Sequence, residues 1–168
     1  MPWDANGIRT DYLGKVYEVK TFVDIVDNTV RVLKKFRKTT PFDAIAFTGT
    51  SGAAVAYPLS YRMKLPLLCV RKPTENSHYV SSGNGEIEGY IDTKRYLIID
   101  DFTCSGDTIR RIIDVIAKDL PSAECAAIAL YTREVGDSRM PFRHTFDDRC
   151  IMVPVIGTRA PDPIDTRR

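Results

Sequence analysis

The sequence predicts an α/β fold with a central parallel sheet flanked by helices. Runs of consecutive apolar residues predict strands buried on both faces, at residues 43–47, 65–70, 96–99, 124–131 and 151–156. Segments with helical periodicity lie between several of these runs, and strands that alternate with helices form parallel sheets. Polar and small residues follow the strands, and ligands of such sheets bind beyond the carboxyl ends of the strands. Candidate functional residues are therefore expected at that edge.

The first helix is expected at residues 20–38. Apolar side chains recur there at steps of three and four residues, which is typical of a helix with one buried face. Basic residues gather at 34–38, where cations stabilise the negative end of the helix dipole, and Pro41 stops the helix. The predicted buried face consists of Phe22, Val23, Val26, Val30 and Leu33.

The next segment has the order strand, small-residue turn, helix. The strand at 43–47 leads into Thr-Gly-Thr-Ser-Gly at 48–52, and alanines from residue 53 begin a helix. The strand at 65–70 ends in Arg71-Lys72-Pro73. Residues 74–90 are rich in Ser, Asn and Gly and have no core pattern, so they predict a long mobile lid loop. A hairpin at the base of this loop is compatible with the sequence.

The most apolar strand, at 96–99, ends in Asp100-Asp101 and leads into a helix at 105–120. Two adjacent acids at this point suit hydroxyl groups or a divalent cation, because buried carboxylates are costly unless they are paired or solvated. The small residues at 103–108 allow backbone N–H groups to approach a phosphate at the start of the helix. A helix cap would account for one such residue, but not for the whole run.

Length and composition favour one domain over residues 1–168, at 18.9 kDa. The 24 basic and 22 acidic residues leave a net charge of +2, so a nucleic-acid partner is not expected. The sequence has neither an apolar run of the ~18 residues that a membrane span needs nor an apolar signal segment, which predicts a cytoplasmic protein without a membrane partner. Four cysteines without a CxxC pair, and two histidines, predict free thiols rather than structural zinc.

Residues 96–108 (YLIIDDFTCSGDT) resemble the phosphoribosyl-pyrophosphate (PRPP) motif of type I phosphoribosyltransferases. That motif consists of four apolar residues, two acids and a loop rich in Thr and Gly. Residues 48–52 are similar to the family's first pyrophosphate loop. Arg71-Lys72 and the long loop after them are similar to its mobile catalytic loop. The resemblance covers about residues 43–133.

The resemblance implies a homodimeric enzyme that transfers the 5-phosphoribosyl group from PRPP to a purine or pyrimidine base and releases pyrophosphate. Its core would span about residues 20–135, with a small hood from about 1–19 and 136–168. Mg²⁺ would bridge pyrophosphate and ribose oxygens, held by Asp100 and Asp101 through ribose hydroxyls or water. The implied catalytic residues are Asp100, Asp101, Lys72 and His78. The implied substrate contacts are Thr48, Gly49, Thr50, Ser51, Gly52 and Arg71 for pyrophosphate, Thr103, Cys104, Ser105, Gly106, Asp107 and Thr108 for the 5′-phosphate, and Arg133 for the base.

Three departures from the family pattern leave the base open between orotate, adenine and a 6-oxopurine. Cys104 stands where 6-oxopurine enzymes usually place an Asp that accepts a proton from the purine. Asp107 lies inside the phosphate loop, where a carboxylate would repel phosphate unless it points away. The lid carries Arg71-Lys72 and His78, as in orotate-type members, but it lacks their second Lys.

Other interpretations stay open beside these roles. His78 equally fits a solvated loop position, and a surface position is the preferred interpretation of Arg133. A PRPP- or nucleotide-sensing regulatory protein on the same fold is the alternative to an enzyme.

Overall fold

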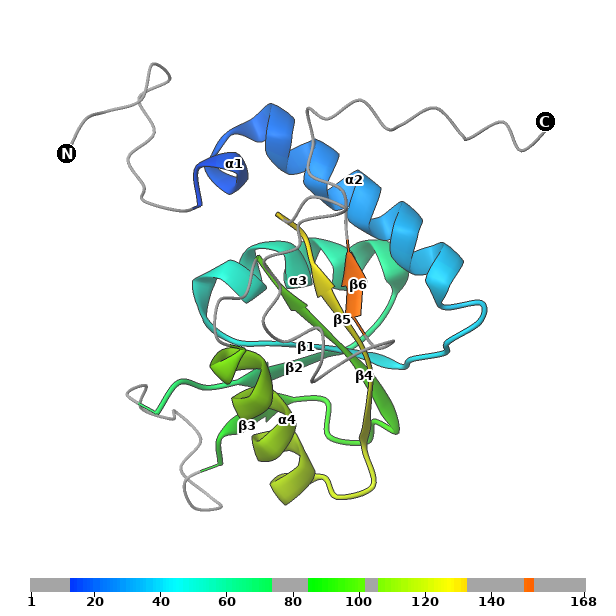
Figure 1. Cartoon of the computed structure of the whole chain (residues 1–168), viewed down its shortest axis with the longest axis vertical. Coiled ribbons are helices and arrows are strands. Elements are labelled where there is room, and N and C mark those ends of the chain that lie inside the picture. The colour runs from blue at the N-terminus through cyan, green and yellow to red at the C-terminus, as the bar shows by residue number, and fades with distance from the viewer. Residues whose placement is uncertain (1–12, 74–84, 102–105, 133–149, 153–168) are drawn as a thin grey trace.

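The computed structural model describes residues 13–73, 85–101, 106–132 and 150–152 of the chain. Its centre is a six-stranded sheet in the order β3-β2-β1-β4-β5-β6, with helices on both faces (Figure 1). This order makes β1 and β4 neighbours, although a helix, two strands and a long loop separate them along the chain. The strands are β1 Ala44–Phe47, β2 Leu67–Val70, β3 Ile87–Gly89, β4 Arg95–Asp100, β5 Glu124–Leu130 and β6 Cys150–Met152.

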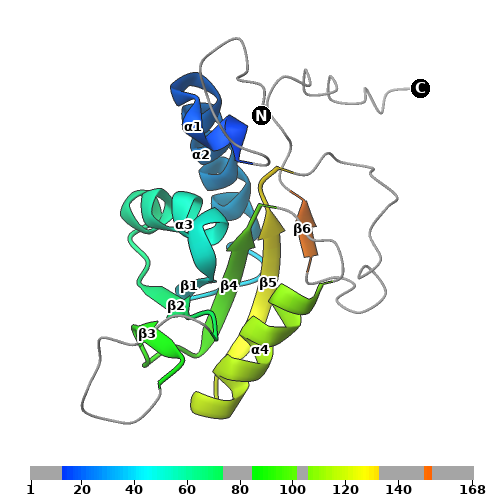
Figure 2. The ribbon, with the colours of Figure 1, turned by 90° about the vertical axis from the view of Figure 1, so that its left-hand side faces the viewer.

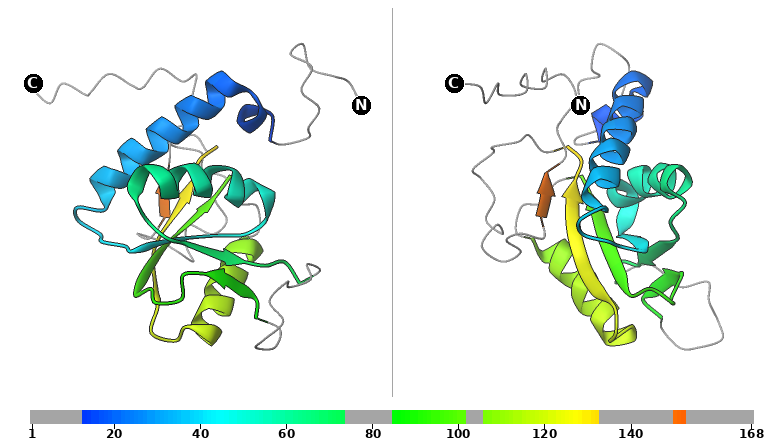
Figure 3. Two further views of the ribbon diagram at one scale, coloured as in Figure 1. Left: turned by 180° about the vertical axis from the view of Figure 1, so that it is seen from behind. Right: turned by 90° about the vertical axis from the view of Figure 1, so that its right-hand side faces the viewer.

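The helices form two layers around the sheet. α1 (Gly14–Tyr17), α2 (Val19–Phe36) and α3 (Gly49–Met63) lie on one side, and α4 (Asp107–Asp119) lies on the other (Figure 2). Seen from behind, α2 and α3 lie in front of the sheet (Figure 3). Alternate residues of the strands belong to two apolar clusters, one on each face of the sheet, because successive side chains of a strand point to opposite faces. Burial on both faces explains why the strands are continuous apolar runs.

The predicted parallel α/β fold is confirmed, with one antiparallel strand at its edge. β1 pairs in parallel with β2 and β4, and β5 pairs in parallel with β4 and β6. β3 pairs with β2 in antiparallel fashion, so a hairpin does form the base of the predicted lid loop. The second predicted helix also begins earlier than its alanines, at Gly49. The first turn of α3 therefore contains most of the small-residue turn.

The buried face of α2 agrees only in part with the prediction, because Phe22 is partly buried and Thr29 is buried as well. Val26, Val30 and Leu33 are buried as expected, but Val23 is 49% exposed and Ile25 is only 1% exposed. The face therefore includes Ile25 in place of Val23, and α2 packs against α3. A pattern of three- and four-residue steps is compatible with burial of either Val23 or Ile25, and tertiary packing determines which of the two is buried.

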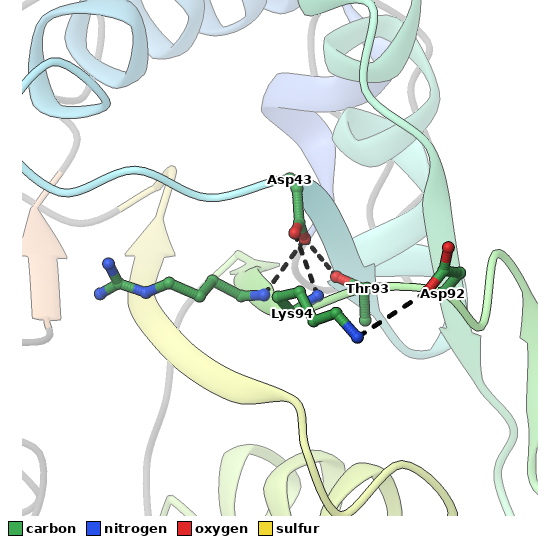
Figure 4. Close-up of polar contacts among 5 residues, drawn as sticks. Asp43, Asp92, Thr93 and Lys94 are labelled. Atoms are coloured by element: carbon green, nitrogen blue, oxygen red, sulfur yellow. Dashed lines mark hydrogen bonds and ion pairs between the residues drawn. The ribbon is translucent and has the colours of Figure 1, made fainter.

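Asp43 anchors the edge of the sheet at which β1 and β4 begin. Its carboxylate accepts hydrogen bonds from the Thr93 hydroxyl and from the backbone N–H groups of Lys94 (3.0 Å) and Arg95 (3.2 Å; Figure 4). Partial burial would raise the pKa of Asp43, but these hydrogen bonds outweigh it and hold the pKa below its usual value. The neighbouring Asp92 forms an exposed ion pair with Lys94, at 3.9 Å.

Three further expectations can be compared with the described residues. Cys69 and Cys125 form no disulfide bond within these ranges. In the ranges given above, no helix is both long and apolar enough to cross a membrane. The last predicted strand coincides with β6 at residues 151–152, and the remaining positions of that prediction, 153–156, lie outside the described residues.

Candidate active site

The carboxyl ends of β1 and β2 are tied together by Thr48. Its hydroxyl donates a hydrogen bond to the carbonyl oxygen of Val70 (2.6 Å), and the residue is 6% exposed. Thr48 has extended backbone and directly precedes α3, whose first N–H groups point out of the sheet edge. This is the geometry in which a helix N-terminus accepts an anion.

Lys72 lies over the start of α3. Gly49 has φ +61°, and a Cβ built on it would lie 2.8 Å from Cε and 3.0 Å from Nζ of Lys72. Any larger residue would displace the lysine, and its backbone would be strained at this φ. The ammonium group and the helix N-terminus, predicted separately from two parts of the sequence, therefore share one site.

Ser51 connects this site to the two acids. Its hydroxyl donates a hydrogen bond to Oδ1 of Asp100 (2.8 Å) at the end of β4. The hydroxyl of Tyr131, just beyond β5, donates to the carbonyl oxygen of Ser51 (2.7 Å). The first turn of α3 is thus held against the ends of both β4 and β5. Tyr131 was not predicted as a site residue, because an apolar strand ending in Tyr carries no sign of a polar contact to a distant helix.

Asp100 and Asp101 are both buried, at 5% and 4% exposure. Burial raises the pKa of Asp100 to about 7, and the charge of Asp101 raises it as well, while hydrogen bonds from Ser51 and from the Asp101 N–H (3.0 Å) oppose the rise. Oδ2 of Asp101 is buried and has no hydrogen-bond partner among the described residues. A buried polar atom without a partner costs about 1–3 kcal/mol. A hydroxyl group or a hydrated cation would remove this cost.

This donor set fits Mg²⁺ only in combination with a ligand. Carboxylate oxygens are the protein ligands that Mg²⁺ prefers, and Asp100 and Asp101 supply them. In the described part of the chain, no group of three or more His, Cys, Asp or Glu side chains could hold a metal alone. Substrate oxygens and water would have to complete the coordination shell.

Gly52 faces the sheet, where it lies close to β1 and β4. A Cβ on Gly52 would lie 2.9 Å from Cβ of Phe47 and 3.2 Å from the carbonyl oxygen of Ile99. Gly52 therefore lets α3 pack closely on β1 and β4. Thr50, on the outer side of the same turn, is exposed.

The start of α4 forms the other part of the predicted anion site. Gly106 has φ +80° and precedes Asp107, whose carboxylate forms an exposed ion pair with Arg110 at 2.8 Å. Asp107 thus has a cation of its own on α4, and Thr108 is exposed. Among the residues predicted to contact substrate, Thr103, Cys104, Ser105, His78 and Arg133 lie outside the described residues.

Arg71 follows β2 and pairs with an acid that the sequence did not single out. Its Nη2 lies 2.7 Å from Oε1 of Glu88 on β3, and its side chain is 15% exposed. Thr132, beyond β5, donates from its N–H (3.0 Å) and its hydroxyl (2.7 Å) to the carbonyl oxygen of Asp101. The position of Thr132 at a strand end is a signal in the sequence that it could belong to the site. The sequence around Glu88 gives no such signal.

Sequence relatives cover part of the chain. No protein-family model matches it. The orotate phosphoribosyltransferase of Rhizobium meliloti is 36% identical over 76 residues, which are 45% of this chain and 31% of that protein. The adenine phosphoribosyltransferase of Ureaplasma parvum is 29% identical over 103 residues, or 55% of this chain and 60% of that protein. The matched residues thus span between about a third and three fifths of these two relatives.

Solved structures extend the similarity to most of the chain. Adenine phosphoribosyltransferase from Thermoanaerobacter pseudethanolicus superimposes with a TM-score of 0.61 at 22% identity, over 90% of each chain. UMP synthase from Leishmania donovani superimposes with a TM-score of 0.63 at 21% identity, over 88% of this chain and 30% of that one. The strand order and these superpositions show that the chain has the type I phosphoribosyltransferase fold, and the sequence relatives that match part of it are orotate and adenine phosphoribosyltransferases.

Proposed function

We propose that this protein transfers the 5-phosphoribosyl group from PRPP to a purine or pyrimidine base and releases pyrophosphate. The hydrogen bond between Ser51 and Asp100 supports the proposal most directly, because it joins a helix start that suits an anion to a pair of buried acids. The proposal also agrees with the names of the sequence relatives, which are orotate and adenine phosphoribosyltransferases. Nothing in those names favours the regulatory alternative.

In the proposed reaction, the bond from C1 of the ribose to pyrophosphate breaks and a bond from C1 to a base nitrogen forms. Lys72 and the N–H groups at the start of α3 would neutralise the charge that develops on the leaving pyrophosphate. Asp101 would accept a hydrogen bond from a ribose hydroxyl at its buried Oδ2, and Asp100 would act beside it. Mg²⁺, held by these two acids through ribose hydroxyls or water, would supply further positive charge for the pyrophosphate oxygens.

The remaining contacts extend this proposal to residues outside the described ranges. The 5′-phosphate would bind at the start of α4, with residues 103–105 completing the site at Gly106 and Thr108. His78 would contact pyrophosphate, and Arg133, with the hood at 1–19 and 136–168, would contact the base. The lid loop predicted at 74–90 would keep water from hydrolysing PRPP.

We also propose that two copies of the chain form a homodimer in the cytoplasm, where it would serve nucleotide salvage. Tyr57 and Tyr61, four residues apart on α3, are 61% and 73% exposed. Aromatic side chains at this spacing form one stripe on a helix and are enriched in protein interfaces. Sedimentation at micromolar concentration tests the dimer, and Tyr61→Ser should weaken it if α3 forms the contact.

A base panel tests the reaction. The protein is incubated with PRPP, Mg²⁺ and, separately, adenine, hypoxanthine, guanine, orotate and uracil, and pyrophosphate release is measured. We expect release with one base or one class of bases. Binding of PRPP without release for any base would favour the sensor, and absence of PRPP binding would contradict both alternatives.

A further inference from the structure

Glu86, just before the edge strand β3, and Glu88, on that strand, each pair with their own cations. Oε1 of Glu86 lies 2.9 Å from Nη2 of Arg111 on α4, and Oε2 of Glu86 lies 4.0 Å from Nζ of Lys118. Glu88 instead pairs with Arg71, at 2.7 Å. Because the Glu86 carboxylate pairs with Arg111 and Lys118 on α4, Glu88 is the acid whose carboxylate pairs with Arg71.

Main-chain geometry sets the position of Glu88. Gly89 has φ +119°, and a Cβ on it would lie 2.1 Å from the carbonyl oxygen of Leu67, so β3 approaches β2 closely here. The register pairs Glu88 with Cys69, two residues before Arg71 on the same face of the strand. The N–H of Arg71 donates to the carbonyl oxygen of Glu86 (2.8 Å), which continues the hairpin beyond β2. The ion pair therefore sits on a backbone of defined register.

Burial makes this ion pair different from a surface pair. A guanidinium remains protonated in proteins, and burying its charge is costly without a counter-charge. The Arg71 side chain is 15% exposed and that of Glu88 is 38% exposed. Without the Glu88 carboxylate, the Arg71 guanidinium would lose a counter-charge that favours its present orientation.

We propose that Glu88 is a positioning residue, which orients the Arg71 guanidinium at the end of β2 before the pyrophosphate group of PRPP binds. This inference rests on the proposed function. A guanidinium has five N–H donors, so one contact, from Nη2 to Glu88, can fix its orientation without engaging all of them. Affinity improves when a side chain is ordered in advance, because its rotamer entropy is not lost on binding.

Four variants of the full chain form the test: Glu88→Ala, Glu88→Gln, Arg71→Ala and the double variant Arg71→Ala/Glu88→Ala. Kd for PRPP with Mg²⁺ is measured by calorimetry, and KM and kcat are measured with the accepted base. Glu88→Ala should raise Kd and KM about 3- to 10-fold, the cost of ordering one long side chain, with little change in kcat. Glu88→Gln keeps an acceptor oxygen at the same reach and should restore most of the affinity.

The double variant shows whether Glu88 acts through Arg71. Arg71→Ala should raise Kd about 10- to 100-fold, as for loss of a charged hydrogen bond. Adding Glu88→Ala to it should cause no further rise, because the residue that Glu88 orients is already absent. Asp27→Ala is the matched control: Asp27 pairs with Arg62 at the same 2.7 Å between α2 and α3, and its loss should leave Kd unchanged.

The outcomes separate the inference from the proposed function. If the wild type binds PRPP and Glu88→Ala binds it equally or more tightly, the inference is wrong and the proposed function stands. Additive effects in the double variant would also overturn the inference. If Glu88→Ala does not fold, Glu88→Gln and Glu88→Asp take its place in the same cycle. A wild type that does not bind PRPP contradicts the proposed function and the inference with it.

Discussion

The hydroxyl of Ser51 donates a 2.8 Å hydrogen bond to Oδ1 of Asp100, a residue 49 positions further along the chain. The contact joins the first turn of α3 to the end of β4, and the Tyr131 hydroxyl ties the same turn to the end of β5. Two sequence runs that predict phosphate chemistry separately thus form one site. The contact also means that Ser51 must be shared between Asp100 and any pyrophosphate that it binds.

The raised pKa of Asp100 predicts a pH-dependent stability. The pKa is about 7 in the folded protein against 3.8 for the unfolded chain, so between these values the folded state binds more protons. The free energy of unfolding should therefore fall as pH rises from about 4 to 7, by at most about 1.4 kcal/mol per pH unit. Asp100→Asn should remove this contribution, whereas the exposed Asp92→Asn should retain it. Urea denaturation of the three proteins across this range checks the prediction, and parallel curves for wild type and Asp100→Asn would contradict it.

Asp101→Asn should abolish turnover and preserve the fold. The buried Oδ2 of Asp101 has no hydrogen-bond partner among the described residues, so loss of its charge removes a cost rather than a contact. We expect kcat/KM to fall by at least about 100-fold, as for removal of one group that stabilises transition-state charge. Steady-state kinetics and thermal unfolding measure the two effects. An unchanged kcat/KM would remove Asp101 from the proposed site.

Gly49→Ala should weaken PRPP binding by moving Lys72. The new Cβ would lie 2.8 Å from Cε of Lys72, and the φ of +61° should lower the free energy of unfolding by about 1–2 kcal/mol. Lys72→Ala should weaken PRPP binding with little effect on stability, because Lys72 is exposed. The double variant should bind PRPP as weakly as Lys72→Ala alone. If the two effects on Kd are additive, Gly49 contributes to binding independently of Lys72.

Asp43→Ala should destabilise the fold without a direct effect on the site. It removes the acceptor of the Thr93 hydroxyl and of two backbone N–H groups, which should cost about 2 kcal/mol at pH 7. Because the folded-state pKa of Asp43 is lowered, its contribution is present above pH 3.8 and is lost as pH falls through the folded pKa. Asp92→Ala, which breaks only an exposed pair, should cost less than about 0.5 kcal/mol. Equal losses in chemical denaturation of the two variants would contradict this assignment.

The elements could be predicted where their cause is local. The apolar run before Asp100-Asp101 and the small residues after it are contiguous, so the sequence predicted a buried strand and a polar loop without knowledge of their partners. β3 was harder to predict. It has three residues, and it exists because Gly89 lets the chain approach β2, a contact that residues 74–90 do not reveal by themselves. The burial of Ile25 rather than Val23 on α2 likewise depends on tertiary packing, since α2 packs against α3.

The sequence by itself determined the alternation of strands and helices, and the chemistry of the residues at each strand end. Hydrophobic periodicity and turn composition act over a few neighbouring residues, so they can be interpreted without the rest of the chain. Only the tertiary structure decided which of these ends meet. The order β3-β2-β1-β4-β5-β6 makes β1 and β4 neighbours, which brings Ser51 to Asp100, and the register of β3 brings Glu88 to Arg71. Such contacts depend on strand order and register over long sequence separations, and these are properties of the packed sheet as a whole.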